Sequence, residues 1–185
     1  MAAAITTRLP GVVLLEPDVH SDDRGFFAET LRESDLEAHG VRDRFVQDNQ
    51  SRSGYGVLRG MHFQIDPPVA KLVRCARGAI VDVVVDVRGS STTYGEWEAF
   101  ELSDRNQRIL YVPAGFAHGF AVVSEVADVL YKQSAEWSAA SDRGFSPADP
   151  AVGVEWPVPP EDRVLSDRDR AAPSLAETSS STAGR

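Results

Sequence analysis

The sequence predicts an all-β fold of the jelly-roll type with a few short helices. Short apolar runs recur along the chain, turn residues such as Gly, Pro, Ser and Asp bound each run, and few stretches show the period of a helix. Many short strands at such spacing are typical of β-sandwiches and jelly rolls. The chain of 185 residues contains no internal repeat, so we expect one domain.

The clearest strand signal lies at residues 81–87. Valine occupies every odd position there, and Asp82, Val84 and Asp86 occupy the even ones. This period of two predicts a strand with two unequal faces. Further strands are expected at residues 71–75, 107–112, 116–123 and 128–132.

Helical signals are weak before the C-terminal third. Residues 34–39 form the exception, because Ser34 or Asp35 can cap a helix there and Gly40 can end it. Residues 176–185 are rich in Ser, Thr, Ala and Gly without apolar periodicity, which predicts a disordered tail. The jelly-roll domain is therefore expected to span residues 1–175.

Composition excludes several classes of function. The apolar run at residues 12–15 is too short for a signal peptide or a membrane span, so we expect a cytoplasmic protein with no membrane partner. A net charge of −9 argues against a nucleic-acid partner and leaves a small anionic ligand held by a few local cations. Cys75 is the only cysteine, which excludes an intrachain disulfide and a cysteine-based zinc site.

Two histidine motifs indicate chemistry. Residues 113–120 match the P-x-G-x-x-H pattern of the second cupin motif, with His118 as its histidine. The first cupin motif places two histidines two apart on a strand and adds a glutamate, but here it reads His62-Phe63-Gln64 and no Glu follows until Glu96. Two imidazoles make a poor metal site, so we expect no metal and no cofactor. His62 can then transfer protons near neutral pH, although a hydrogen-bonded core histidine is an equal alternative for this residue alone.

Seven motifs in a fixed order carry a more specific signal. From about Gly11 to Pro173, the chain resembles the dTDP-4-dehydrorhamnose 3,5-epimerase family. The resemblance implies a cupin-type jelly roll and a homodimer. It also implies an isomerase that epimerises a dTDP-4-keto-6-deoxyhexose at C3 and C5 in deoxysugar biosynthesis. The motifs are DDRGFFAE (22–29), QDN (47–49), LRGMHFQ (58–64), AKLVRC (70–75), GFAHGF (115–120), LYK (130–132) and LSDRD (165–169).

The resemblance implies a catalytic set of three residues. His62 matches the family's proton acceptor and Tyr131 its proton donor. Carbons C3 and C5 both lie beside the C4 ketone, so a base can remove a proton from either carbon and an acid can return one on the opposite face. A neutral imidazole with a pKa of about 6.5 and a phenol with a pKa of about 10 suit these roles. Asp169 matches the carboxylate that orients the histidine, although its charge run alone indicates a solvated surface.

Ten further positions match substrate-binding residues of the family. Lys71 would stabilise the developing enolate oxygen, unless it is an exposed strand lysine. Arg24 and Arg59 would contact the diphosphate. His118 would contact the substrate, and Asp82 is either its orienting partner or a surface residue. The remaining positions would hold the nucleotide: Phe27, Glu29, Gln47, Asn49, Trp137, which replaces a frequent tyrosine, and Asp142, which replaces a frequent glutamate.

Three alternatives remain at this point. The first is an epimerase that inverts only C3, or a ketoisomerase, in an antibiotic sugar pathway; retention of both His62 and Tyr131 favours double epimerisation. The second is a non-catalytic sugar-nucleotide binding module, against which the complete acid, base and carboxylate set argues. The third is a metal-dependent cupin, which would purify with bound iron, manganese or zinc.

Overall fold

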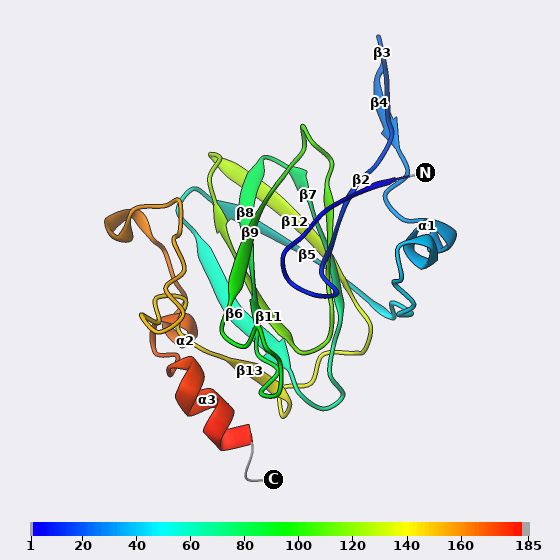
Figure 1. Ribbon diagram of the computed structural model, residues 1–185. Coiled ribbons are helices and arrows are strands. Elements are labelled where there is room, and N and C mark those ends of the chain that lie inside the picture. Colours follow the sequence, from blue (N-terminus) through cyan, green and yellow to red (C-terminus); the bar gives the residue numbers. More distant parts are fainter. Residues whose placement is uncertain (1, 183–185) are drawn as a thin grey trace.

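The computed structural model describes residues 2–182, and its body is a sandwich of two antiparallel β-sheets (Figure 1). This architecture confirms the predicted all-β jelly roll with a few short helices. One sheet has the order β1 (Ala3–Ile5), β2 (Val13–Glu16), β10 (Ile109–Val112), β7 (Lys71–Arg77), β12 (Val126–Gln133) and β5 (Gln47–Gly54). The other has the order β13 (Asp142–Gly144), β6 (Leu58–Gln64), β11 (Phe116–Val122), β8 (Ala79–Asp86) and β9 (Trp97–Ser103).

Strand β8 shows how the core is built. Ile80 and Val84 pack between the two sheets, whereas Val83 and Val85 join a second apolar cluster on the outer face. The predicted strand is confirmed, but both of its faces are buried because the C-terminal segment covers the outer one. The interpretation of Asp82 as a surface residue is wrong, since its side chain is fully buried.

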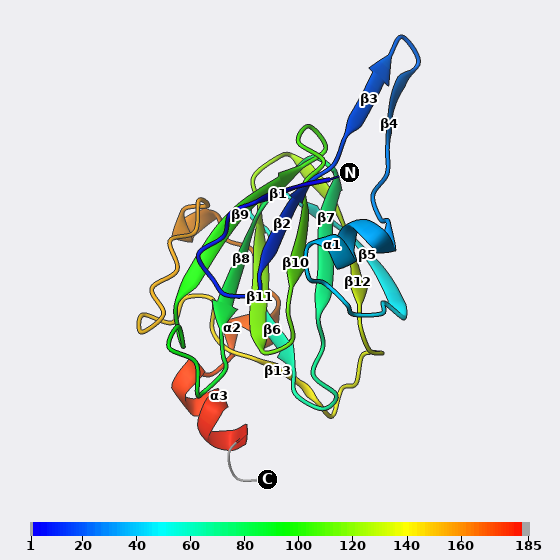
Figure 2. The same ribbon diagram turned by 45° about the vertical axis from the view of Figure 1, so that its right-hand side comes forward.

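Two strands leave the sandwich. β3 (Val19–Asp22) and β4 (Gly25–Ala28) pair only with each other and form a hairpin that projects from the body (Figure 2). Every residue from 19 to 27 is exposed, including Phe26 at 59% and Phe27 at 65%. Aromatic side chains exposed to this degree on a projecting hairpin are unusual and indicate a binding surface.

Helix α1 (Glu33–Ala38) confirms the predicted helix with a different start. Arg32 is the N-cap and no side chain caps the helix, so the predicted capping by Ser34 or Asp35 is wrong. Leu36 drives the placement instead, because it is buried with Leu72 on the outer face of the six-stranded sheet. Gly40 follows the helix with a φ of +81°, as expected for a terminating glycine.

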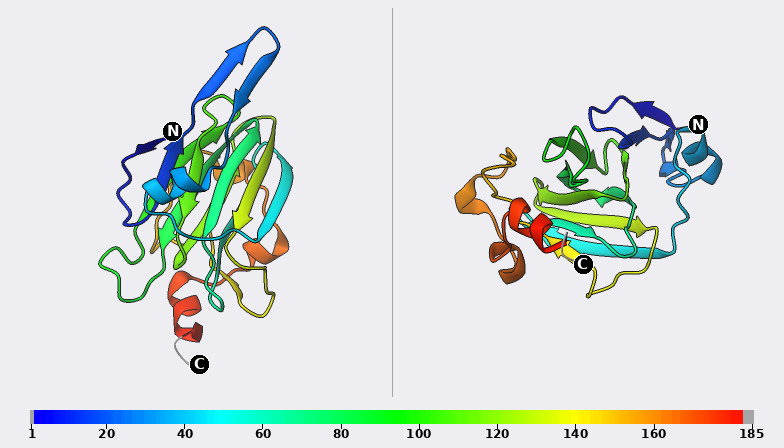
Figure 3. Two further views of the ribbon diagram at one scale, coloured as in Figure 1. Left: turned by 90° about the vertical axis from the view of Figure 1, so that its right-hand side faces the viewer. Right: turned by 60° about the horizontal axis from the view of Figure 1, so that its bottom comes forward.

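The C-terminal part contains η1 (Pro160–Asp162), α2 (Asp167–Arg170) and α3 (Leu175–Thr182), which lie along one side of the body in the right-hand view of Figure 3. The prediction of a disordered tail is corrected for residues 176–182, which lie in α3; residues 183–185 lie outside the described residues. Leu175 anchors this helix in the outer apolar cluster. Ser174 caps it, because its Oγ accepts the Glu177 N–H at 3.3 Å and its own N–H donates to the Glu177 carboxylate at 2.8 Å. Within residues 2–182, no helix is both long and apolar enough to cross a membrane.

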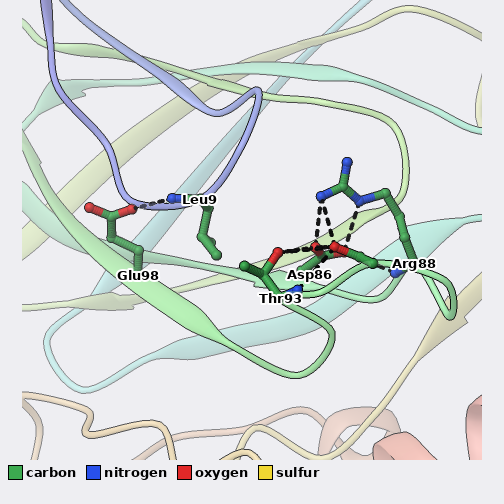
Figure 4. Close-up of polar contacts among 6 residues, drawn as sticks. Leu9, Asp86, Arg88, Thr93 and Glu98 are labelled. Carbon is green, nitrogen blue, oxygen red and sulfur yellow. Dashed lines mark hydrogen bonds and ion pairs between the residues drawn. The ribbon is translucent and has the colours of Figure 1, made fainter.

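The turn between β8 and β9 is held by a buried carboxylate, Asp86 (Figure 4). Arg88 donates to it through Nε at 2.9 Å and through Nη2 at 2.7 Å, and the Ser91 and Thr93 hydroxyls each donate at 2.6 Å. Burial would raise the pKa of Asp86, but these hydrogen bonds lower it overall. The Arg88 guanidinium also lies 4.3 Å above the centre of the Phe116 ring, which ties the turn to the core.

We expect Asp86→Ala to lower the free energy of unfolding by about 3 kcal/mol, because it leaves a partly buried guanidinium and two hydroxyls without their acceptor. Chemical denaturation at neutral pH measures this loss. Glu16→Ala is the matched control, since it removes a carboxylate from the Glu16–Arg108 pair at the surface and should cost at most about 1 kcal/mol. Equal losses in the two variants would show that the Asp86 network does not stabilise the fold.

Candidate active site

A cavity of about 600 Å³ lies between the two sheets, a volume typical of small-molecule sites. His62 on β6 and His118 on β11 enter it from one sheet, and Lys71 on β7 and Tyr131 on β12 enter it from the other. Residues 164–169 close one side. The cavity thus gathers these predicted site residues: His62, Tyr131, Asp169, Arg59, Lys71, His118, Trp137 and Asp142.

Two motif glycines bring the histidines together. A Cβ at Gly60 would lie 2.5 Å from the Cα of Gly119, so β6 and β11 can approach this closely only without side chains at these positions. Gly60 also has a φ of +123°, which other residues rarely adopt. The register of the two strands then places His62 directly opposite His118.

His62 is bonded to a buried carboxylate. Its Nε2 lies 2.7 Å from Oδ1 of Asp169, which is only 4% exposed. Helix α2 turns Asp169 inward because Ser166 caps the helix and accepts the Asp169 N–H at 3.1 Å. Burial would raise the pKa of Asp169, but the hydrogen bonds from His62, Ser166 and Gly60 lower it overall. An ionised Asp169 accepts a hydrogen bond from the Nε2–H of His62, which leaves the lone pair of the neutral ring on Nδ1. The solvated-surface interpretation of Asp169 is therefore wrong.

Tyr131 lines the cavity from the sheet opposite to that of His62. Its ring lies edge-on to His118, with 6.4 Å between the ring centres. Burial raises the pKa of the phenol, Arg59 opposes this effect, and Asp142 adds to it. The hydroxyl therefore keeps its proton at neutral pH and can donate it.

Lys71 is buried rather than exposed, which overturns the alternative of a surface lysine. Only 6% of the residue is accessible, and Nζ donates to the backbone oxygen of His62 at 3.2 Å. Burial lowers the pKa of Lys71 to about 8, partly offset by the carboxylates of Asp142 and Asp82. The amine is thus mostly a cation at pH 7, held in a water-poor place where its charge acts strongly.

His118 has a buried carboxylate as its partner. Its Nδ1 lies 3.4 Å from Oδ2 of Asp82, and both side chains are nearly inaccessible. Burial, together with the charges of Lys71 and His62, lowers the pKa of His118 well below its usual value, so the ring is neutral. Burial also raises the pKa of Asp82, and the nearby charge of Lys71 only partly offsets this rise. Sequence reasoning left Asp82 undecided, although an aspartate within a run of valines was the available signal.

The mouth of the cavity carries an ion pair. Nη1 of Arg168 lies 2.7 Å from Oδ2 of Asp142, and 54% of the arginine side chain is exposed against 12% of the aspartate side chain. Sequence reasoning missed Arg168; the signal was a cation next to Asp169 in the same motif. Trp137, which is 55% exposed, stands beside this mouth and donates its backbone N–H to Gln47 at 2.7 Å.

Gln64, which replaces a histidine of the first cupin motif, has a structural role. Its amide donates to the backbone oxygens of Pro67 at 3.0 Å and Glu136 at 3.3 Å, and it accepts the Ser138 N–H at 2.9 Å. Gln64 therefore holds the loop that carries Trp137. Among the described residues, no three His, Cys, Asp or Glu side chains are grouped so that they could hold a metal ion.

Five predicted binding residues do not line the cavity. Arg24 and Phe27 lie on the projecting hairpin, and Glu29 follows it; Arg24 pairs with Asp22 and Glu29 pairs with Arg32. The other two, Gln47 and Asn49, lie on β5 beside Tyr131 and bond to each other at 2.8 Å.

Comparison with known proteins agrees with this geometry. The sequence profile of the family described as dTDP-4-dehydrorhamnose 3,5-epimerase matches residues 6–177. The dTDP-4-dehydrorhamnose 3,5-epimerase of Methanothermobacter thermautotrophicus is 45% identical over 174 residues, which cover 94% of either chain. The match with the dTDP-6-deoxy-D-glucose-3,5-epimerase of Legionella pneumophila, solved in complex with dTDP-4-keto-L-rhamnose, has a TM-score of 0.92 at 40% identity and covers 95% of this chain and 94% of that one.

A third similar protein is a 4-keto-6-deoxy sugar epimerase from the novobiocin biosynthetic gene cluster of Streptomyces spheroides. Its match has a TM-score of 0.93 at 37% identity and covers 98% of this chain and 92% of that one. Both the profile and these relatives span the hairpin, the cavity motifs and most of the C-terminal segment. The predicted resemblance is thereby confirmed: the chain is an isomerase that belongs to the dTDP-4-dehydrorhamnose 3,5-epimerase family.

Proposed function

We propose that this chain inverts C3 and C5 of a dTDP-4-keto-6-deoxyhexose, with His62 as the base and Tyr131 as the acid. One observation carries the proposal. His62, which is paired with Asp169, and Tyr131 come from opposite sheets and line the same cavity, so a sugar ring between them has a base on one face and an acid on the other. Inversion at a carbon beside a ketone needs this arrangement.

The reaction begins when Nδ1 of His62 takes the proton from C3 or C5. The electrons of the C–H bond move into the ring, the C4 carbonyl becomes an enolate, and Asp169 stabilises the imidazolium that forms. The Lys71 cation stabilises the enolate oxygen. Tyr131 then protonates the same carbon from the other face. Exchange with solvent returns the proton to the phenolate and removes the one held by His62.

Nucleotide binding is expected in the part of the cavity that Arg59 and Arg168 line, because they supply positive charge against the net −9 of the chain. Arg24, Phe27 and Glu29 cannot reach the cavity of their own subunit. We propose a homodimer in which the projecting hairpin of one subunit completes the nucleotide site of the other. We also propose a cytoplasmic location, because Cys75 is a free, buried thiol and disulfides are rare in that compartment.

Incubation with dTDP-4-keto-6-deoxyglucose in deuterated water, followed by NMR, tests the proposed function. Label at both C3 and C5 with inverted product is the expected result. Label and inversion at C3 alone would identify a monoepimerase, and movement of the ketone would identify a ketoisomerase. Binding of the sugar nucleotide without any exchange would mean a non-catalytic module.

Arg59→Ala should weaken the binding of dTDP itself by about 10-fold, because the guanidinium is expected to contact the diphosphate rather than the sugar. Calorimetry with dTDP measures this change, and the loss should shrink as salt screens the contact. Arg105→Ala is the matched control, since this arginine is exposed in the turn before β10 and does not line the cavity. If the two variants bind dTDP equally well, the diphosphate site lies elsewhere.

A further inference from the structure

Gln133 is a buried amide in the cavity that the mechanism above does not use. It lies on the inner face of β12, two residues after Tyr131, and only 6% of it is exposed. Its direct neighbours across the sheet are Lys71 on β7 and Gln47 on β5. Gln133 therefore lies beside both the proposed acid and the proposed enolate-stabilising cation.

The carbonyl oxygen of this amide is buried and has no hydrogen-bond partner within residues 2–182. Its polar neighbours have other partners: Gln47 bonds to Asn49 and to the Trp137 N–H, and Lys71 Nζ bonds to the His62 oxygen. A buried acceptor without a partner costs about 1–3 kcal/mol, so such groups are rare and call for an explanation.

Gln64 shows what a structural glutamine looks like in the same protein. It is also 6% exposed, but both ends of its amide are bonded, to Pro67 and Glu136 through nitrogen and to Ser138 through oxygen. Gln64 does not line the cavity, whereas Gln133 does. The contrast indicates that the missing partner of Gln133 comes from the ligand.

A sugar hydroxyl fits this site chemically. The terminal torsion of glutamine is soft, so the amide can turn either its oxygen or its NH₂ toward the cavity. A hydroxyl can donate to the first and accept from the second. Next to Lys71 and Tyr131, the hydroxyls within reach are those near the ketone and the reacting carbons, at C2 or C3 of the ring.

We propose that Gln133 binds the C2 or C3 hydroxyl of the sugar and makes the enzyme selective for hydroxylated over deoxygenated 4-keto sugars. This inference rests on the proposed function, and it adds a specificity-determining residue to it. A site that bonds a substrate hydroxyl rejects the analogue that lacks it, because the amide is then left unpaired in the closed cavity.

The test measures deuterium exchange at C5, which all the substrates retain, for wild type and Gln133→Leu. The substrates are dTDP-4-keto-6-deoxyglucose and its 2-deoxy and 3-deoxy congeners. Wild type should prefer the hydroxylated sugar over one congener by about 10- to 100-fold in kcat/KM, and Gln133→Leu should lose that preference. Comparing the ratio of kcat/KM between substrates within each variant cancels any general loss of activity.

Thermal melting without ligand supplies an independent readout. Gln133→Leu removes an unpaired buried acceptor, so its Tm should stay equal or rise, whereas Gln64→Leu should melt at a lower temperature because it breaks three hydrogen bonds. An unchanged substrate ratio in a folded Gln133→Leu or Gln133→Met enzyme overturns the proposal for Gln133 and leaves the proposed function standing. A wild type that exchanges no deuterium with any substrate overturns both.

Discussion

His62→Asn is expected to reduce turnover by about 10²- to 10⁴-fold, the usual contribution of a proton-transfer group. Asparagine keeps a polar group near Asp169 but cannot accept a proton at neutral pH. Deuterium exchange and inversion should both be lost, because no proton leaves C3 or C5 without the base. NMR of the sugar in deuterated water should therefore show neither label nor inversion.

The fold should survive this change, because His62 is only partly buried and lies outside the three apolar clusters. A melting curve close to that of wild type checks this point. His39→Asn is a matched control, since His39 contacts the backbone oxygen of Ala2 at 3.0 Å and does not line the cavity. If His62→Asn exchanges label at C3 as fast as the control, His62 is not the base.

Tyr131→Phe should separate proton removal from inversion. The variant keeps the ring and loses only the hydroxyl, so packing should change little. His62 still abstracts the proton, and the enolate is then reprotonated mainly on the face that lost it. Net inversion should fall by about 10²- to 10⁴-fold, whereas label should still enter starting material that keeps its configuration.

One NMR time course per variant, following label and configuration together, measures both rates. Exchange that outpaces inversion is the expected signature. Tyr111→Phe is a useful control, because its hydroxyl bonds to Asp43 on the outer face of the same sheet. Inversion at the wild-type rate in Tyr131→Phe would mean that another group donates the proton.

The strands and the cavity could be predicted largely from local sequence. Apolar runs bounded by turn residues marked β7, β10, β11 and β12, because a short, continuous apolar run between turns is typical of a buried strand. The motif residues His62 and His118 had to face inward together once they were placed on paired strands. These predictions succeeded because each depends on the geometry of one strand and its neighbour.

Other features depend on contacts that no local pattern contains. The charge run that contains Asp169 has the composition of a solvated surface, but the Ser166 cap turns Asp169 inward. The Ser/Thr-rich tail has the composition of a disordered segment, but Leu175 packs into an apolar cluster. Asp82 is ambiguous in sequence because burial of both faces of β8 is a property of the whole fold. The hairpin that bears Arg24 carries no sign in its sequence that it projects from the body.

The position of Gln64 bears on what a histidine in its place would do to this fold. A single codon change to histidine would restore the spacing of a cupin ligand pair, yet the same change would remove the three hydrogen bonds that hold the Trp137 loop. Position 64 therefore holds the rim of the cavity. A histidine there would create the ligand pair and loosen the Trp137 loop in one step, so the two properties cannot be varied independently at this position.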